Sequence, residues 1–236
     1  MQKLTALALA ALLGKASLAQ TMVADTALLR QGVEAAVASY HLALGPQAGL
    51  YNGVEHMRYL PTIEGLPYFV VDDWQSATIR YDDVLYRDVP VRYDLVKDAL
   101  IVSHPDGFRN FYLFSPRVDS FTIGAAHFVY LVQDSAKGAP APGFYQVLAR
   151  GPMTVLARRS RKIEERLQER NLYFMNTDRF YILKDGVYHS PRNEGDLLEL
   201  VGDRRKEARQ LLKQRALRFR KFPEQAILTV AGFYNQ

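Results

Sequence analysis

Apolar and polar residues alternate through residues 74–104 and predict short antiparallel strands with one buried face. Every second residue from Val89 to Leu95 is apolar, which is typical of a strand with one face in a core and the other in water. The pairs Asp82-Asp83, Arg87-Asp88 and Lys97-Asp98 interrupt the alternation and suit turns. We therefore expect an antiparallel meander, with the segments on either side extending the same sheet.

Similar segments continue to Ser190 and bring the total to about ten strand candidates. Asp185-Gly186 and Asn52-Gly53 both favour tight hairpin turns, because Asn, Asp and Gly tolerate positive φ. Residues 164–171 are too polar for a core strand, so we expect a mobile loop or a short exposed helix there.

Helical spacing replaces the alternation at both ends of the chain. Apolar residues recur at intervals of three and four in residues 26–42 and again after Asn193, where Asn193 can cap a short helix. A second helix is expected over residues 203–221, and Pro223 suits the first position of a third. The pattern predicts an α+β fold: an antiparallel β-meander sheet, curved and able to form a half-barrel, with an N-terminal helix and C-terminal helices.

Residues 1–19 have the three parts of a secretory signal peptide: Lys3, the apolar run of residues 4–13, and Ser17-Leu18-Ala19. We expect export to the periplasm or association with the outer membrane. The rest, residues 20–236, is expected to be a single β-rich domain with a helical part from about residue 193 to 236. The chain has no cysteine, so its stability depends on the core rather than on disulfides.

The positive charge is concentrated in the C-terminal part. From Gly151 onward there are 18 Lys and Arg against 11 Asp and Glu, whereas the whole chain has a net charge of +5. Basic segments contact anionic partners or form solvated helical faces; export argues against nucleic acid, and a protein partner is left open. The residues expected to contact an anionic lipid or envelope surface are Arg204, Arg205, Lys206, Arg209, Lys213, Arg218, Arg220 and Lys221.

No stretch carries a catalytic, metal-binding or cofactor-binding signature. There is no Gly-x-Ser-x-Gly, no His-Glu-x-x-His and no phosphate-binding Gly-rich loop. The sequence therefore predicts no catalytic residue, metal ligand or cofactor. Trp74 is most simply a core anchor, with a sugar-stacking platform as the alternative. The histidines are scattered along the chain: His41, His56, His104, His127 and His189.

Several segments together resemble a group of uncharacterised exported proteins of Bacteroidetes-type bacteria. They are residues 50–53 (LYNG), 65–69 (GLPYF), Trp74, 81–95 (YDDVLYRDVPVRYDL), 143–148 (GFYQVL), 183–188 (LKDGVY), Leu197-Leu198 and 204–207 (RRKE). The resemblance implies export and a single unit. It implies no activity and no catalytic residues.

The sequence leaves three functional hypotheses. The first is a non-enzymatic exported protein with a structural or binding role. The second is a carrier that holds an apolar ligand or lipid in the concavity of the sheet. The third is a hydrolase of cell-wall or sugar polymers that uses two carboxylates from Asp72, Asp73 and Glu55.

Overall fold

The computed structural model describes residues 45–236 except 135, 136 and 169, together with positions 29, 32, 33, 36 and 39. The predicted signal peptide lies outside the described residues. The predicted N-terminal helix lies largely outside them, and its five described positions are helical. The chain divides into two units after Ala48, and all the described strands belong to the second unit, Gly49–Gln236.

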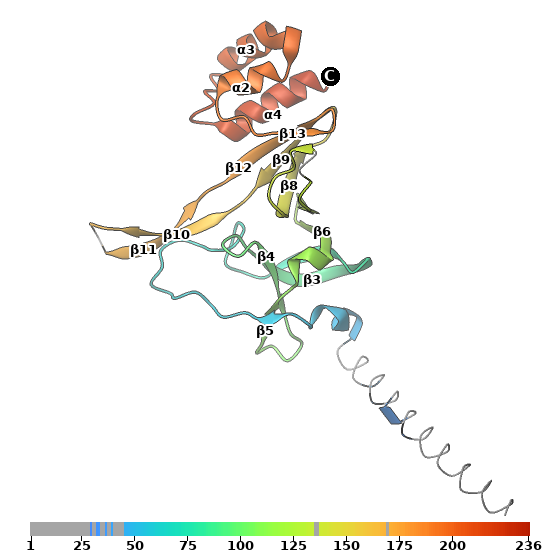
Figure 1. The fold of residues 1–236 in the computed structure, drawn as a ribbon. Coiled ribbons are helices and arrows are strands. Elements are labelled where there is room, and N and C mark those ends of the chain that lie inside the picture. Colours follow the sequence, from blue (N-terminus) through green and yellow to red (C-terminus); the bar gives the residue numbers. More distant parts are fainter. Residues whose placement is uncertain are drawn as a thin grey trace, which may run out of the picture. The chain divides into compact units, whose positions relative to one another are not determined.

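Within the described residues, eleven strands form one open antiparallel sheet in the order β1-β5-β4-β3-β2-β6-β7-β8-β9-β12-β13 (Figure 1). Two more strands, β10 and β11, pair only with each other. The strands are β1 (Val54–Glu55), β2 (Gln75–Tyr81), β3 (Val84–Asp94), β4 (Ala99–Ser103), β5 (Asn110–Tyr112), β6 (Val118–Ile123), β7 (Ala126–Leu131), β8 (Gly143–Ala149), β9 (Met153–Arg158), β10 (Arg161–Arg166), β11 (Asn171–Asn176), β12 (Arg179–Lys184) and β13 (Val187–His189). Two short 3-10 helices, η1 (Gly45–Leu50) and η2 (Ser115–Arg117), accompany them.

The alternation along β3 sends its side chains to two different faces of the sheet. On one face, Val89, Val91 and Tyr93 enter the main core. On the other face, Arg92 and Asp94 are buried as well. Successive side chains of a strand point to opposite faces, so this part of the sheet is covered on both sides. The second cover is the long connection between β1 and β2, residues 56–74, called here the 56–74 loop.

The sheet is strongly curved. Tyr93 on β3 and Phe144 on β8 are four positions apart in the strand order, yet their ring centroids lie only 5.8 Å apart. The backbone N–H of Arg161, at the start of the β10–β11 hairpin, donates to the carbonyl of Leu95 just after β3 over 2.9 Å. The sheet therefore curls until the β3–β4 turn meets β8 and β9 without closing, and the expected curved α+β fold is confirmed.

The C-terminal helices cover the β9–β12 end of the sheet. They are α2 (Glu194–Glu199), α3 (Arg205–Gln214) and α4 (Pro223–Tyr234), with the 3-10 turn η4 (Gly202–Arg204) before α3. Asn193 caps α2 by accepting a hydrogen bond from the N–H of Asp196 at 2.9 Å, as expected. Their apolar residues share a second core with Met153, Val155 and Ile182 of the sheet. Among the described helices, none combines the length and apolar character that a membrane crossing requires.

The expected helix over residues 203–221 is shorter than the prediction. The α-helix ends at Gln214, and Ala216 has a φ of 51°, a left-handed conformation that terminates helices. Residues 215–222 then form a turn-rich segment that leads to Pro223. Pro223 does occupy the first turn of α4.

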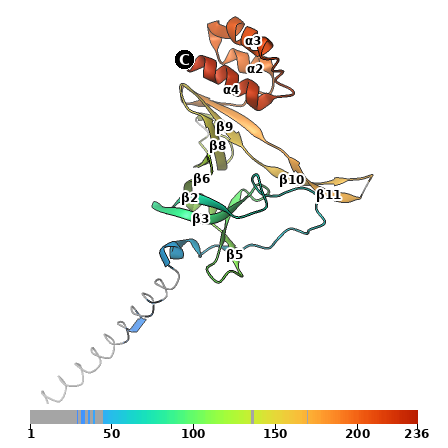
Figure 2. The same ribbon diagram turned by 180° about the vertical axis from the view of Figure 1, so that it is seen from behind.

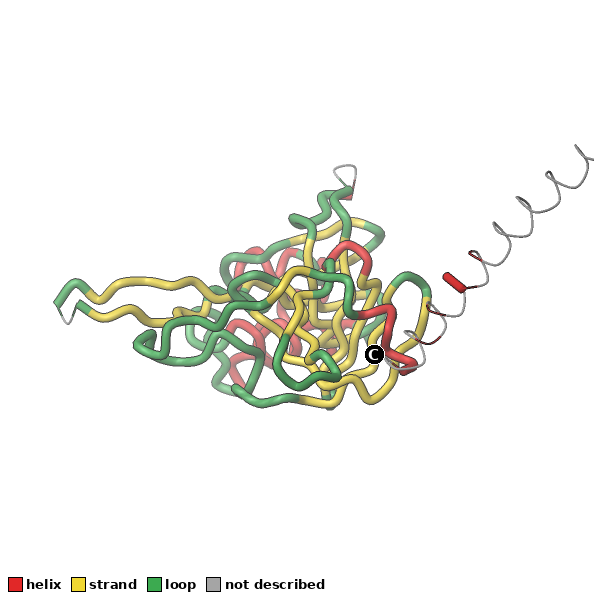
Figure 3. Tube along the Cα trace, turned by 90° about the horizontal axis from the view of Figure 1, so that it is seen from below, coloured by secondary structure: helices red, strands yellow, loops and turns green. Residues whose placement is uncertain are grey.

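The prediction for residues 164–171 was wrong. They belong to the β10–β11 hairpin, which projects from the rest of the unit (Figures 2 and 3). Strand β10 exposes five of its six residues, and β11 has four half-buried and two exposed residues, so neither shows the alternation of buried and exposed residues that marks a strand packed on a core. Strand β11 of this hairpin is bound to the 56–74 loop through Glu64, which exchanges backbone hydrogen bonds of 2.9 Å with Leu172 and Phe174.

Two expected turns are also different. Asn52-Gly53 does not make a hairpin; Gly53 lies so close to the carbonyl of Tyr112 that a Cβ there would collide with it. At Arg87-Asp88 the strand continues, and the ladder with β2 shifts register instead, with Asp88 at a φ of 53°. A β-bulge and a tight turn can both place a residue at positive φ. The pair Arg87-Asp88 suits either structure, so the sequence suggests a turn where the strand has a bulge.

Candidate functional site

A buried carboxylate, Asp94, is the centre of a polar network beneath the 56–74 loop. Its side chain is fully buried and accepts hydrogen bonds from the hydroxyls of Tyr112 at 2.8 Å and Tyr59 at 3.0 Å. The backbone N–H groups of Val96 and Lys97 donate to its other oxygen at 2.9 and 3.0 Å. With its oxygens saturated in this way, the carboxylate can remain buried, since a buried charge is tolerated when it is fully hydrogen-bonded.

His56 extends this network in one direction. Burial lowers the pKa of His56, and the nearby Asp94 opposes that effect only in part, so the ring is neutral at pH 7. Because the Tyr112 hydroxyl donates its hydrogen bond to Asp94, it accepts a hydrogen bond from the N–H at Nδ1 of His56, 2.8 Å away. The other nitrogen, Nε2, is then an acceptor for the hydroxyl of Tyr68 at 3.2 Å. The hydrogen bonds therefore run from Tyr68 through His56 and Tyr112 to Asp94.

A pocket of about 440 Å³ opens on the outer side of this network. Its polar walls include Tyr59 and Tyr68, which the network holds in place. The full lining comprises Arg58, Tyr59, Leu60, Pro61, Ile63, Gly65, Leu66, Pro67, Tyr68, Asp72, Arg92 and Phe174. Phe174 comes from the β10–β11 hairpin and packs edge-to-face on Tyr59 at 5.3 Å between ring centroids. The pocket is therefore built by the loop, the sheet and the hairpin together.

Arg92 is the buried cation of this pocket. Its guanidinium carbon lies 4.7 Å from the ring centroid of Trp74 and 5.4 Å from that of Tyr68. One terminal nitrogen lies 3.3 Å from the carboxylate of Asp72, and Nε is buried without a hydrogen-bond partner. The residue is only 8% exposed. Trp74 therefore has a structural contact with a cation, beyond the core packing that the sequence predicts for it.

The tyrosine hydroxyls of this arrangement are hydrogen-bond donors. Burial raises the pKa of Tyr59 and of Tyr112, and the charge of Asp94 raises both further. Their hydroxyls therefore stay protonated and keep donating. The pocket lining contains no serine, threonine or lysine. Among the side chains that can act as nucleophiles, it holds the carboxylate of Asp72 and the hydroxyls of Tyr59 and Tyr68.

The three carboxylates proposed for a hydrolase are not gathered at this pocket. Asp72 lines it and binds Arg92. Asp73 accepts a hydrogen bond from the backbone N–H of Trp74 at 2.7 Å, and Glu55 is exposed on β1. Glycosidase chemistry requires a pair of carboxyl groups on either side of the bond that is cleaved, and the pocket has one of the three. Within the part of the chain that the structure describes, no group of three or more His, Asp or Glu is placed to hold a metal.

The face on which an apolar ligand was expected is occupied by aromatic side chains. Tyr81, Tyr93, Phe121, Phe128 and Phe144 are all at most 1% exposed and pack together in the main core. Phe121 and Phe128 are stacked with their centroids 4.6 Å apart. The carrier hypothesis stays a prediction, and on this face a ligand would have to displace these rings.

The predicted basic surface lies on the helical part. Between Arg204 and Lys221 the sequence has nine basic residues and one acidic residue, Glu207. Arg204 is half-buried, with its guanidinium 3.8 Å from the ring centroid of Phe233, and Arg209 lies 3.8 Å from Glu194. The other predicted contact residues are exposed: Arg205, Lys206, Lys213, Arg218, Arg220 and Lys221. Phe222 follows them and is 37% exposed.

Sequence reasoning did not find the network around Asp94. Arg92 and Asp94 occupy the positions of β3 that the alternation assigns to water, so the pattern alone places both at the surface. The usable signal is chemical: an Arg and an Asp two residues apart share one face, and the preceding segment supplies Tyr59, Tyr68 and Trp74. No protein-family model, curated protein or solved structure matches the chain.

Proposed function

We propose that this protein is a non-enzymatic, exported binding protein that attaches to anionic lipid headgroups of the cell envelope through its basic helical surface. That surface consists of Arg205, Lys206, Arg209 and Lys213 on α3, and Arg218, Arg220, Lys221 and Phe222 in the segment that follows. The signal-peptide pattern of residues 1–19 supports export. The observation that carries the proposal is the concentration of exposed cations beside an exposed aromatic ring.

The physical argument combines charge and burial. Each Lys or Arg near an anionic membrane surface contributes about 1 kcal/mol to attachment, and the effect declines as salt screens the charges. An aromatic side chain such as Phe222 can enter the boundary between headgroups and acyl chains, as in amphipathic segments that lie on membranes. Several weak charge contacts and one apolar contact together favour reversible attachment.

Co-sedimentation with vesicles tests the proposal. We expect the protein to bind vesicles of phosphatidylglycerol and phosphatidylcholine at low salt, to be released at high salt, and to ignore pure phosphatidylcholine. The variant Arg218→Glu/Arg220→Glu/Lys221→Glu should bind at least about 10-fold more weakly, given about 1 kcal/mol for each cation.

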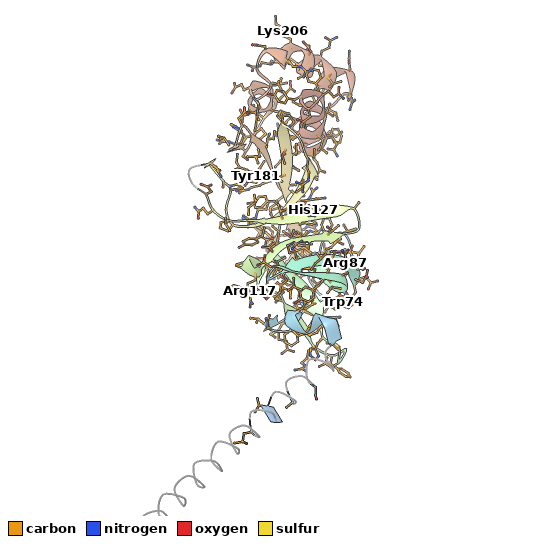
Figure 4. The ribbon with its side chains drawn as sticks, turned by 90° about the vertical axis from the view of Figure 1, so that its right-hand side faces the viewer. Trp74, Arg87, Arg117, His127, Tyr181 and Lys206 are labelled. Carbon is orange, nitrogen blue, oxygen red and sulfur yellow. The ribbon has the colours of Figure 1, made fainter. Side chains whose placement is uncertain are left out.

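A charge-matched control separates this surface from net charge alone. Arg87, Lys162 and Arg179 are exposed cations on strands of the unit, and Figure 4 shows Arg87 far from Lys206 on the helices. The variant Arg87→Glu/Lys162→Glu/Arg179→Glu has the same net charge and should bind nearly as well as the unaltered protein. Absence of binding to anionic vesicles at low salt, or equal losses in both variants, would exclude the proposal.

A further inference from the structure

We propose that the pocket under the 56–74 loop binds a small monocarboxylate with an apolar body, and that Arg92 binds its carboxylate group. This is a second site, separate from the basic helical surface. Its lining comes from residues 58–72, Arg92 and Phe174, and it shares no residue with that surface.

The first argument is the incomplete pairing of a buried cation. A buried guanidinium is costly unless its charge and its donors are satisfied, and an Arg side chain has five N–H donors. Asp72 meets Arg92 through one terminal nitrogen at 3.3 Å, and the side chain of Asp72 is itself 53% exposed. Donors of Arg92 therefore remain, and the residue lines the pocket.

The second argument is that the guanidinium is already held in a fixed orientation. Trp74 and Tyr68 contact it at 4.7 and 5.4 Å from its carbon, and Tyr68 is in turn bound to His56. A planar fork that is fixed before binding suits a carboxylate, because both partners are planar and bind through two parallel hydrogen bonds. The network around Asp94 thus has a role in the pocket: it keeps two lining residues, Tyr59 and Tyr68, in position.

The third argument concerns the charge and the body of the ligand. The charged residues of the lining are Arg58, Arg92 and Asp72. Their net charge of +1 is balanced by one negative charge, whereas a phosphate dianion would leave an excess of negative charge. The remaining walls are largely apolar: Leu60, Pro61, Ile63, Leu66, Pro67 and Phe174. The volume of about 440 Å³ lies within the range of small-molecule sites.

Octanoate is a suitable probe, with octanol as the uncharged molecule of the same chain length. Trp74 is the single tryptophan of the chain and contacts Arg92 directly, so its fluorescence reports on the pocket. We expect saturable binding of octanoate, at concentrations below micelle formation, at least about 10-fold tighter than that of octanol, because a charge-assisted hydrogen bond is stronger than a neutral one. Equal binding of the two probes, or no saturable change with octanoate, would overturn the proposal.

Three variants locate the site, with calorimetry as the readout. Arg92→Lys keeps the charge but removes the fork and should weaken octanoate binding about 10-fold, whereas Arg87→Lys on the same strand should leave it unchanged. Leu66→Trp fills the pocket from a position that is 37% exposed and should abolish binding even if Arg92→Lys does not fold. Unaltered affinity in Leu66→Trp would overturn the proposal. The vesicle-binding variant at Arg218, Arg220 and Lys221 should retain octanoate binding, so the two proposals can fail separately.

Discussion

The side chain of Asn235, one residue from the C-terminus, is hydrogen-bonded to both backbone groups of Met153 at the start of β9. Its oxygen accepts from the N–H of Met153 at 2.8 Å, and its amide nitrogen donates to the carbonyl of Met153 at 3.1 Å. Gly151 leaves the room for this contact, because a Cβ at that position would collide with the Asn235 side chain. Asn235 therefore links the end of α4 to the start of β9, over a separation of 82 positions.

Asn235→Ala should destabilise the protein by about 1–3 kcal/mol, because it leaves the buried N–H of Met153 without a partner. Urea unfolding measures the free-energy change. Gln225→Ala, at an exposed position of α4, is the control and should change the free energy of unfolding by less than about 0.5 kcal/mol. Similar values for both variants would mean that the contact of Asn235 does not hold the helix.

Gly143→Ala should destabilise the protein, because Gly143 has a φ of 147° and lies against two charged side chains. A Cβ there would meet the carboxylate of Asp98 and the guanidinium of Arg158. Asp98 pairs with Arg158 at 3.3 Å and accepts from the Tyr93 hydroxyl at 2.6 Å, so the methyl group would disturb the contact that joins the β3–β4 turn to β8 and β9. We expect a loss of about 1–3 kcal/mol from backbone strain alone.

Gly232→Ala is the matched control for this substitution. Gly232 lies in α4, and a Cβ at that position meets no atom within 4 Å. Alanine is the better helix former by about 1 kcal/mol, so thermal unfolding should show an unchanged or higher midpoint. A Gly143→Ala protein as stable as the Gly232→Ala protein would contradict the role given to Gly143.

His56 should make the protein less stable in mild acid. Burial lowers its pKa in the folded state below the ordinary 6.5, against the effect of Asp94 and with that of Lys97, Arg92 and Arg58. His56 is therefore protonated more readily in the unfolded chain than in the folded protein. Its contribution to the free energy of unfolding is complete above about pH 6.5 and is lost as the pH falls below that value.

Urea unfolding at pH 8 and pH 5 measures this contribution. We expect the free energy of unfolding to fall between the two values, and His56→Gln to show a smaller fall. Burial also lowers the pKa of His127. This residue is present in both proteins and does not affect the comparison. An equal fall in the variant would assign the acid sensitivity to other groups.

The sequence determined the features that depend on near neighbours. The alternation along Val89–Leu95, the Asp185-Gly186 hairpin, the Asn193 cap and the start of α4 at Pro223 were all predicted, because propensity and turn geometry act within a few residues. The curved α+β plan follows from these features taken together. The prediction for residues 164–171 was wrong for the same reason, because an exposed strand such as β10 has no local pattern that distinguishes it from a polar loop.

Tertiary structure alone decided which polar residues are buried. Arg92 and Asp94 occupy the face of β3 that local alternation assigns to water, and they are buried because the 56–74 loop folds over them. The partners of Asp94 are distant in the sequence: Tyr59 lies 35 residues before it and Tyr112 lies 18 residues after it. Tyr68, which contacts Arg92, lies 24 residues before that residue. A charge is stable inside a protein only when such partners converge on it, and that convergence is a property of the folded chain, not of any local segment.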